Sequence, residues 1–459
     1  MSGTFSTANT NLKKVFIMKQ LRIIVIIFIF AFTAFMQNFL QAQTINFRFS
    51  TYFYSWQRLD SLTSTIGATP TYTTHLRGYQ NLMFDVNYKK WTFTTFTQVD
   101  EDVTNRAGKG FNYRLYNMMI KGNNLFDALD IKLGRQYISA GSGKGTIDGL
   151  YLKLKLGKNK EYQFIGYGGY LSPLSYEFEK YLQLKENFLA GGQFLYYGVK
   201  DLTLGLSYAN KNRKNPDYYA LRPDSLFNTR TVLIETDSKA DQIAGIDANY
   251  RLMKKHNLYG RGYFDVNRTK FIRGEFNGNF ELTKNLRLSA GYTYREPQIS
   301  YNSMFWVFEH KKYQELEGGL DYITKFLGSD INLSGRVADV LYDGDHSLKI
   351  QLGVGNSIFG LSFTKYTGYT GEAEGIYGYI NQELIKTKLT FSANLNYTGY
   401  KLGKYDDSRS TALGGILGLT WRPDPRISID GQGQVLVNDV YKYDTRFLIG
   451  FNYWLFSKL

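Results

Sequence analysis

Between residues 129 and 156, apolar side chains stand at every second position of two segments, with polar side chains between them. In its second half the leucines fall on one side of an extended chain and the polar residues on the other: Leu150, Leu152, Leu154 and Leu156 against Tyr151, Lys153 and Lys155. The first half repeats the pattern, and the link SAGSGKGT is glycine-rich, so the two halves predict one antiparallel hairpin. A soluble sandwich would alternate in the same way. The number of such hairpins decides what the apolar side contacts.

Alternating segments follow one another from Thr44 to the end of the chain, with almost no helical period. Short connections (NYKKW, GVKD, MKKHN, LTKN, RPDPR) alternate with long ones (55–77, 170–187, 210–239, 296–312). Short turns at one end and long loops at the other are the layout of an outer-membrane barrel. We therefore predict an all-β fold: one transmembrane antiparallel up-and-down β-barrel over residues 43–459, without a plug domain, of about 18 to 22 strands.

The first 42 residues have the parts of a secretory signal peptide. Lys19 and Arg22 precede an apolar run of about 13 residues from Ile23 to Phe35, and the small-residue site LQAQ follows. We predict cleavage after Ala42, with Met18 as the true start of translation. The alternative is an uncleaved anchor helix, which the short apolar run disfavours.

Composition narrows the class of protein further. Aromatic residues make up 17% of the chain, yet the mean hydropathy is only −0.33, which excludes a membrane protein built of many apolar helices. There is no cysteine, which excludes a lipid-anchored lipoprotein, disulfides and thiolate metal sites. The seven prolines all fall in proposed connections, as a closed sheet requires, because proline cannot donate a ladder hydrogen bond.

The last strand resembles the C-terminal assembly signal of Gram-negative outer-membrane barrels. Its apolar face carries Phe447, Ile449, Phe451, Tyr453 and Leu455, although the chain ends on Leu459 where that signal has an aromatic residue. The resemblance implies recognition by the barrel-assembly machinery. A narrower resemblance, LGRQ at 133–136 with DG at 148–149, is to the corresponding hairpin of porin-like and alginate-export-type barrels. It implies a plug-free conduit with a basic lumen that suits an anionic solute or polymer.

The net charge points to anionic partners. Of the formal +15, the basic residues Lys13, Lys14, Lys19 and Arg22 lie before the predicted cleavage site, which leaves +11 on the mature chain. Outer-membrane lipid with lipopolysaccharide, an anionic solute in the pore and nucleic acid are the candidates. Nucleic acid is disfavoured because the basic residues are spread singly and form no basic helix or tract.

If the apolar side of each strand contacts lipid, the opposite side lines the lumen. The predicted basic lining is Arg48, Lys132, Lys153, Lys155, Arg261, Arg273, Arg287 and Arg336, and the acidic lining is Asp85, Asp130, Asp265, Glu275 and Asp430. A narrow lumen focuses the field of such residues, so an excess of Arg and Lys would favour anions. The alternative is that these charges pair across strands and fill the interior. The best candidate pathway is the hairpin 270–295, where Arg273, Arg287 and Arg295 share a face with Glu275.

Arg135 breaks the alternation, because it falls on the lipid side. A basic residue at mid-membrane costs about 2 to 4 kcal/mol there, so we expect a bulge at Gly134 or a position near the rim.

Barrel enzymes need a histidine with a serine or acidic partner at the outer rim. The run YDGDHS, with Asp343, Asp345, His346 and Ser347, holds these residue types, but neighbours on one strand point to opposite sides, so we expect no enzyme. None of the four histidines has metal-ligand spacing, and we predict neither metal nor cofactor. A receptor coupled to the inner membrane is disfavoured because strand one begins so close to the predicted cleavage site.

The sequence therefore predicts a porin-like channel in the outer membrane of a Gram-negative bacterium, for small or polymeric solutes that are anionic. The alternative is a structural or surface-binding barrel that acts through its outer loops. The long loops 210–239 and 296–312 are compatible with either, as a constriction folded inward or as a binding surface.

Overall fold

The computed structural model describes residues 44–59, 72–104, 111–173, 175–176, 184–214, 217–223, 227–235, 240–298, 311–326, 328–368, 372–401, 408–439 and 443–458. The predicted signal peptide, most of the long loop 296–312 and His310 lie outside these residues. Within them, no helix is long and apolar enough to cross a membrane.

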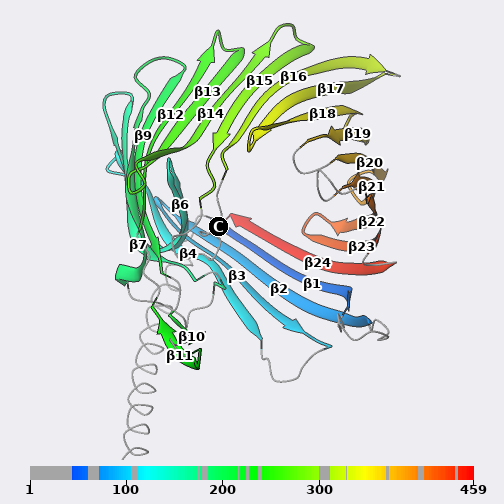
Figure 1. The fold of residues 1–459 in the computed structure, drawn as a ribbon, viewed down its shortest axis with the longest axis horizontal. Helices are drawn as coiled ribbons and strands as arrows, with labels where there is room; N and C mark the ends of the chain where they lie inside the picture. Colours follow the sequence, from blue (N-terminus) through cyan, green and yellow to red (C-terminus); the bar gives the residue numbers. More distant parts are fainter. Residues whose placement is uncertain are drawn as a thin grey trace, which may run out of the picture.

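The chain forms one closed antiparallel β-barrel of 22 strands, drawn as a ring in Figure 1. Its strands are β1 (Thr44–Leu59), β2 (Tyr72–Tyr88), β3 (Trp91–Asp102), β4 (Asn112–Leu125), β5 (Leu129–Ala140), β6 (Gly143–Leu156), β7 (Tyr162–Leu171), β8 (Asn187–Tyr196), β9 (Leu202–Arg213), β12 (Asp241–Leu252), β13 (His256–Asp265), β14 (Lys270–Glu281), β15 (Leu286–Arg295), β16 (Tyr313–Phe326), β17 (Ser329–Tyr342), β18 (Asp345–Gly355), β19 (Phe359–Tyr366), β20 (Ala373–Ile385), β21 (Leu389–Tyr400), β22 (Ser410–Asp424), β23 (Ile427–Asn438) and β24 (Asp444–Lys458). The strand number lies at the top of the predicted range.

Closure comes from the first and last strands. Strand β1 pairs with β2 on one side and with β24 on the other, from Thr44 opposite Lys458 to Ser55 opposite Phe447. No barrel edge is therefore left to aggregate. The start of β1 and the end of β24 both lie at the barrel end that carries the short connections, as the even strand number requires.

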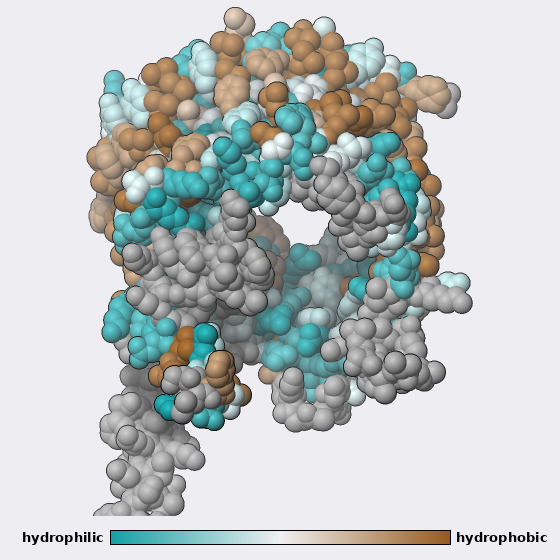
Figure 2. All heavy atoms as spheres, viewed as in Figure 1, coloured by the Kyte–Doolittle hydropathy of each residue, from teal (hydrophilic) through white to brown (hydrophobic). Residues whose placement is uncertain are grey.

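The alternation read from the sequence separates two faces. In β6 the four leucines from Leu150 to Leu156 are exposed on the outside, while Tyr151, Lys153 and Lys155 are partly covered on the inside. Figure 2 shows apolar residues around the outside of the molecule, hydrophilic residues within, and an opening through its centre. An outward apolar surface on a closed sheet is stable in lipid, because every strand hydrogen bond is satisfied within the wall.

The seam between the first and last strands is held by a polar centre on the inner face. The Asn452 side chain is 2% exposed. Its Oδ1 accepts hydrogen bonds from Ser50 Oγ at 2.7 Å and Tyr52 OH at 2.6 Å, and its Nδ2 donates to Asp430 Oδ2 at 2.8 Å. One asparagine thus links β23, β24 and β1.

A second, two-stranded sheet lies outside the ring, formed by β10 (Tyr218–Pro223) and β11 (Thr229–Ile234) in the connection between β9 and β12. A short 3-10 helix (Leu184–Glu186) precedes β8. The expectation that every proline lies outside the strands is wrong at two positions. Pro223 ends β10, and Pro423 lies near the end of β22, where the register with β23 shifts and ladder donors are not required.

Candidate functional site: a narrowed, basic lumen

The hairpin of β5 and β6 leaves the barrel wall before its end. Strand β5 pairs with β4 only as far as Arg135, opposite Met118, and β6 pairs with β7 only from Ile147, opposite Leu171. The two strands continue to pair with each other up to Ala140 opposite Gly143. Residues 136–146, which we call the inner hairpin, therefore pair with no strand of the wall, and β6 lies inside the ring in Figure 1.

Three glycines that are register partners allow the bend. Gly134 lies opposite Gly149, which lies opposite Gly169. A Cβ on Gly149 would lie 2.1 Å from Gly168 O, and one on Gly134, whose φ is +119°, would lie 2.3 Å from Met118 O. No other residue type fits this row, so the three strands can approach and turn together.

Arg135 lies at the point where the inner hairpin separates from the barrel wall. It keeps the outward direction that strict alternation assigns, yet it is only 3% exposed. Its Nε and Nη2 donate to the two carboxylate oxygens of Asp148 at 2.7 and 2.8 Å, and its Nη1 donates to the carbonyls of Leu115 at 2.9 Å and Tyr176 at 3.1 Å. The predicted bulge is absent, because the register passes Gly134 without a shift. Full pairing with a carboxylate and two carbonyls keeps the guanidinium out of lipid instead.

The inner hairpin packs against the inner face of the wall. Its strands and β7–β8 enclose a buried apolar cluster: Ile138, Ala140, Ile147, Ile165, Tyr167, Leu171 and Leu189. At the tip, Ser142 N donates to Ser207 Oγ at 3.0 Å, Ser142 Oγ donates to Ile243 O at 3.0 Å, and Tyr263 OH donates to Gly141 O at 3.1 Å. The tip is thus held on β9, β12 and β13 and narrows the lumen from that side.

Basic residues gather beside this tip. A cavity of about 270 Å³ is lined by Lys144 of the hairpin and by Lys211, Arg273 and Arg295 of the wall, with Asp241 and Glu296 as its acidic members. The excess of positive charge lies at the narrowed level of the barrel. A low-dielectric wall around such an excess favours anions over cations.

Glu275 organises the arginines of this region. Its side chain is 6% exposed and accepts from Arg261 Nε and from Arg273 Nε, both at 2.6 Å, and from Arg295 Nη2 at 3.4 Å. Three cations share this carboxylate, and Asp247 lies opposite Arg261 in the register, so the formal charge of the group is +1. Arg295 is the most open of them, with 56% of its side chain exposed.

The structure brings only part of the predicted basic lining together. Arg261 and Arg273 meet at Glu275, whereas Arg287 lies at the far end of β15, opposite Glu281 and Asp321. Arg287 therefore does not belong to the cluster with Arg273 and Arg295 that the hairpin 270–295 suggested.

The remaining basic positions have separate local partners. Lys155 pairs with Asp130 at 2.7 Å, and Lys153 lies opposite Asp130 in the register. Lys132 lies over the Tyr151 ring at 4.6 Å. Arg48 lies over the Trp454 ring at 5.2 Å, and Arg336 is 3.5 Å from Asp321.

The predicted acidic residues likewise have neighbours on adjacent strands or turns. Asp265 is 3.4 Å from Arg268, and Asp430 accepts from Thr420 Oγ1 at 2.8 Å as well as from Asn452. Asp85 lies opposite Asn46 and Thr94. Much of the lining charge is thus paired across strands, which is the alternative that the sequence left open.

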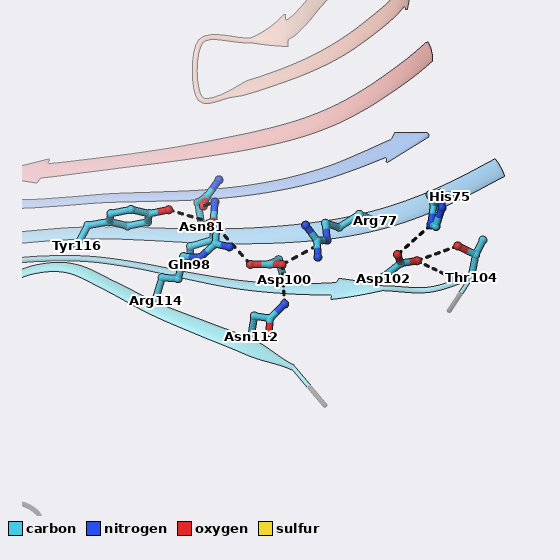
Figure 3. A network of polar contacts seen from close by, with 10 residues as sticks. All are labelled: His75, Arg77, Asn81, Gln98, Asp100, Asp102, Thr104, Asn112, Arg114 and Tyr116. Carbon is cyan, nitrogen blue, oxygen red and sulfur yellow. Dashed lines mark hydrogen bonds and ion pairs between the residues drawn. The ribbon is translucent and has the colours of Figure 1, made fainter. Parts of the chain in front are cut away.

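A second polar network, on β2–β4, was not predicted from the sequence (Figure 3). Asp100, 1% exposed, lies 3.4 Å from Arg77 Nε and 3.6 Å from Arg114 Nη1 and accepts from Asn112 Nδ2 at 3.1 Å. Next to it, His75 Nδ1 lies 3.2 Å from Asp102. The only sequence signal was the spacing of acidic residues by two in QVDED, which places Asp100 and Asp102 on one face.

The run YDGDHS does not assemble a base and a nucleophile. His346 is exposed and its Nδ1 lies 3.0 Å from Asp339 on the outer face, while Ser347, the next residue, is 1% exposed. Their side chains lie on opposite sides of β18, as strand alternation predicts. Among the described residues, no group of three or more His, Cys, Asp or Glu could hold a metal ion.

The closed sheet with its apolar outer face and polar inner face defines the class: a transmembrane β-barrel. Neither a protein-family model nor a curated protein sequence matches the chain. Among solved structures it is similar to Pseudomonas aeruginosa OpdQ, at 10% identity and a TM-score of 0.41 over 90% of this chain and 98% of that one. It is also similar to Acinetobacter baumannii OccAB4, at 8% identity and a TM-score of 0.43 over 91% of this chain and 100% of that one.

Proposed function

We propose that the protein is a passive outer-membrane channel whose narrowed level favours small or polymeric anionic solutes. The opening through the ring, the inner hairpin packed on one side of it and the basic excess beside the hairpin tip support this function. The observation that carries the anion preference is the sharing of Glu275 by three arginines next to Lys144 and Lys211. The protein holds these cations in place on rigid strands, so they act on a passing solute without reorganisation.

Single-channel recording of the purified protein in a planar bilayer under a salt gradient tests the proposal. We expect steady open steps and a reversal potential on the anion side. The variant Arg273→Gln/Arg295→Gln should move that potential toward zero, because it removes two cations of the narrowed level. Arg409→Gln is the matched control, since Arg409 pairs with Glu374 at 3.3 Å before β22 and lies away from the cavity.

The outcomes separate the parts of the proposal. Conducting channels without anion preference would reject the solute class and keep the channel. A folded, heat-modifiable barrel that never conducts would reject the channel itself.

A specific observation favours the second candidate, a barrel that binds partners at its surface. The β10–β11 hairpin outside the ring exposes large apolar side chains, with Tyr219 74%, Leu221 70% and Phe227 88% exposed. Exposed apolar groups on a projecting hairpin are typical of binding surfaces.

Replacing residues 217–235 by a Gly-Ser linker would remove this hairpin. Unchanged conductance with lost adhesion or lost co-purification of a partner would support the surface role.

A further inference from the structure

The connections on the side of the chain ends form a rim of unusual charge. Ten short connections join strand pairs there, from Lys89–Lys90 after β2 to Pro425–Arg426 after β22. They carry eleven basic residues, Lys89, Lys90, Lys158, Lys160, Lys200, Lys254, Lys255, Lys284, Lys386, Lys388 and Arg426, and three acidic ones, Asp127, Glu161 and Asp201. We call the eleven basic residues the basic rim. This end of the barrel therefore carries a local charge of +8 on turns alone.

The basic rim is open to its surroundings. All eleven side chains are exposed. Lys90 pairs with Asp127 at 3.6 Å, but both groups are more than half exposed, so the pair leaves them accessible. The acidic residues are too few to neutralise the ring. Charges of one sign on tight turns repel each other, so they require an external anionic partner or counter-ions.

Aromatic side chains on the outer face lie immediately beside the rim. Trp91 follows Lys90 directly and is 44% exposed, and Trp421, opposite Leu389 and thus one residue from Lys388 in the register, is 50% exposed. The Lys89 ammonium lies 5.1 Å from the centre of the Tyr88 ring. Aromatic belts of this kind mark the membrane interface of β-barrels. The basic rim therefore lies next to the level along the barrel axis at which we expect the lipid head groups.

We propose that the basic rim binds the head groups of anionic phospholipids in the leaflet that faces the short turns. The basic residues lie on seven of the ten turns, so they face the lipid annulus around most of the barrel. Exposed lysines next to an apolar, aromatic wall can extend their ammonium groups to phosphates while their stems cover that wall. The proposal concerns the outer surface and is independent of whether the lumen conducts.

Trp91 and Trp421 provide the readout. The protein is reconstituted in vesicles that contain brominated phosphatidylglycerol or brominated phosphatidylcholine, and quenching of tryptophan fluorescence gives the relative association constant of the two lipids at the wall. A Trp56→Phe/Trp306→Phe/Trp454→Phe background leaves these two reporters alone, and the wild type is measured in parallel in case that background folds poorly. We expect phosphatidylglycerol to be preferred by about two- to fivefold at low salt, and the preference to fall in 0.5 M NaCl.

A matched pair of variants locates the effect. In the same background with Trp91→Phe added, so that Trp421 alone reports, Lys386→Gln/Lys388→Gln/Arg426→Gln removes three rim charges around Trp421 and should bring the lipid ratio close to one. Lys365→Gln/Lys401→Gln/Arg409→Gln removes three charges at the opposite end of β19, β21 and β22 and should leave the ratio unchanged. Equal quenching of the wild type by the two lipids would overturn the proposal and favour an acidic soluble partner. An equal loss of the preference for phosphatidylglycerol in both variants would also overturn the proposal. The preference would then depend on the net charge of the protein and not on the basic rim.

Discussion

Arg135 and Asp148 form a two-point ion pair between β5 and β6, on the face that a few residues away is covered with leucine. The pair marks the level at which β5 separates from β4 and the inner hairpin turns into the lumen. The same guanidinium donates to two backbone carbonyls, so it replaces the strand contacts that the departing hairpin gives up. The Arg135 side chain thus stabilises the wall at the level where the glycine row allows the hairpin to bend.

Arg135→Ala should lower the free energy of unfolding by about 2 kcal/mol, because it leaves the partly buried Asp148 carboxylate without its partner. Urea unfolding in detergent, followed by heat-modifiable gel mobility, measures the change. The double variant Arg135→Ala/Asp148→Ala should recover part of the loss, since no unpaired charge remains. Identical losses in the single and double variants would show that the unpaired Asp148 carboxylate costs nothing in Arg135→Ala, contrary to this prediction.

Gly149→Ala should impair assembly of the barrel, because its Cβ would meet Gly168 O at 2.1 Å and neither backbone can move without opening a strand ladder. Gly166→Ala, in the neighbouring strand β7, is the matched control: its Cβ has no atom within 4 Å, and we expect normal yield. The measurement is the folded fraction in isolated outer membranes. Equal yields for the two variants would mean that the glycine row is not needed for the bend.

Removal of the inner hairpin tip should enlarge the channel. Gln136 and Ile147 are register partners, so an Asn-Gly turn can join them directly and replace residues 137–146. We expect a several-fold larger single-channel conductance, because the hairpin no longer covers one side of the lumen. Conductance equal to that of the wild type would place the narrowest level elsewhere.

Asn452→Ala should weaken the seam between β24 and β1. It removes the acceptor of the buried Ser50 hydroxyl and of the half-buried Tyr52 hydroxyl, at a cost of about 2 kcal/mol. The exposed Asn381 of β20 provides the comparison: Asn381→Ala should change the urea midpoint little. If both variants unfold at the same urea concentration as the wild type, the polar centre does not stabilise closure.

Much of the fold could be predicted from the chain because strand alternation has a period of two and leaves little freedom. The leucines at 150–156 and the apolar residues of the last strand take the outer face that their spacing assigns. Arg135 is the informative exception. Its outward direction followed from the same period, but its environment depends on Leu115 and Tyr176, which are 20 and 41 residues away in sequence.

The candidate site was only partly predictable for the same reason. Alternation places Arg273, Arg287 and Arg295 on one face, and it contains no information on how far apart along the barrel axis they lie. Only the register shows that Arg273 is opposite Arg295 and that Arg287 is at the other end of the strand. Lys144 was overlooked because a glycine-rich link between two strands resembles any exposed turn.

The sequence by itself determined a closed barrel with one apolar and one polar face, because side-chain direction in a strand is a local property of the backbone. The tertiary structure alone decided that one hairpin would leave the wall, that its tip would pack on β9, β12 and β13, and that three arginines would share Glu275. Those features depend on contacts between strands far apart in the chain. Such contacts are fixed by the register around the whole ring, which no single stretch of sequence contains.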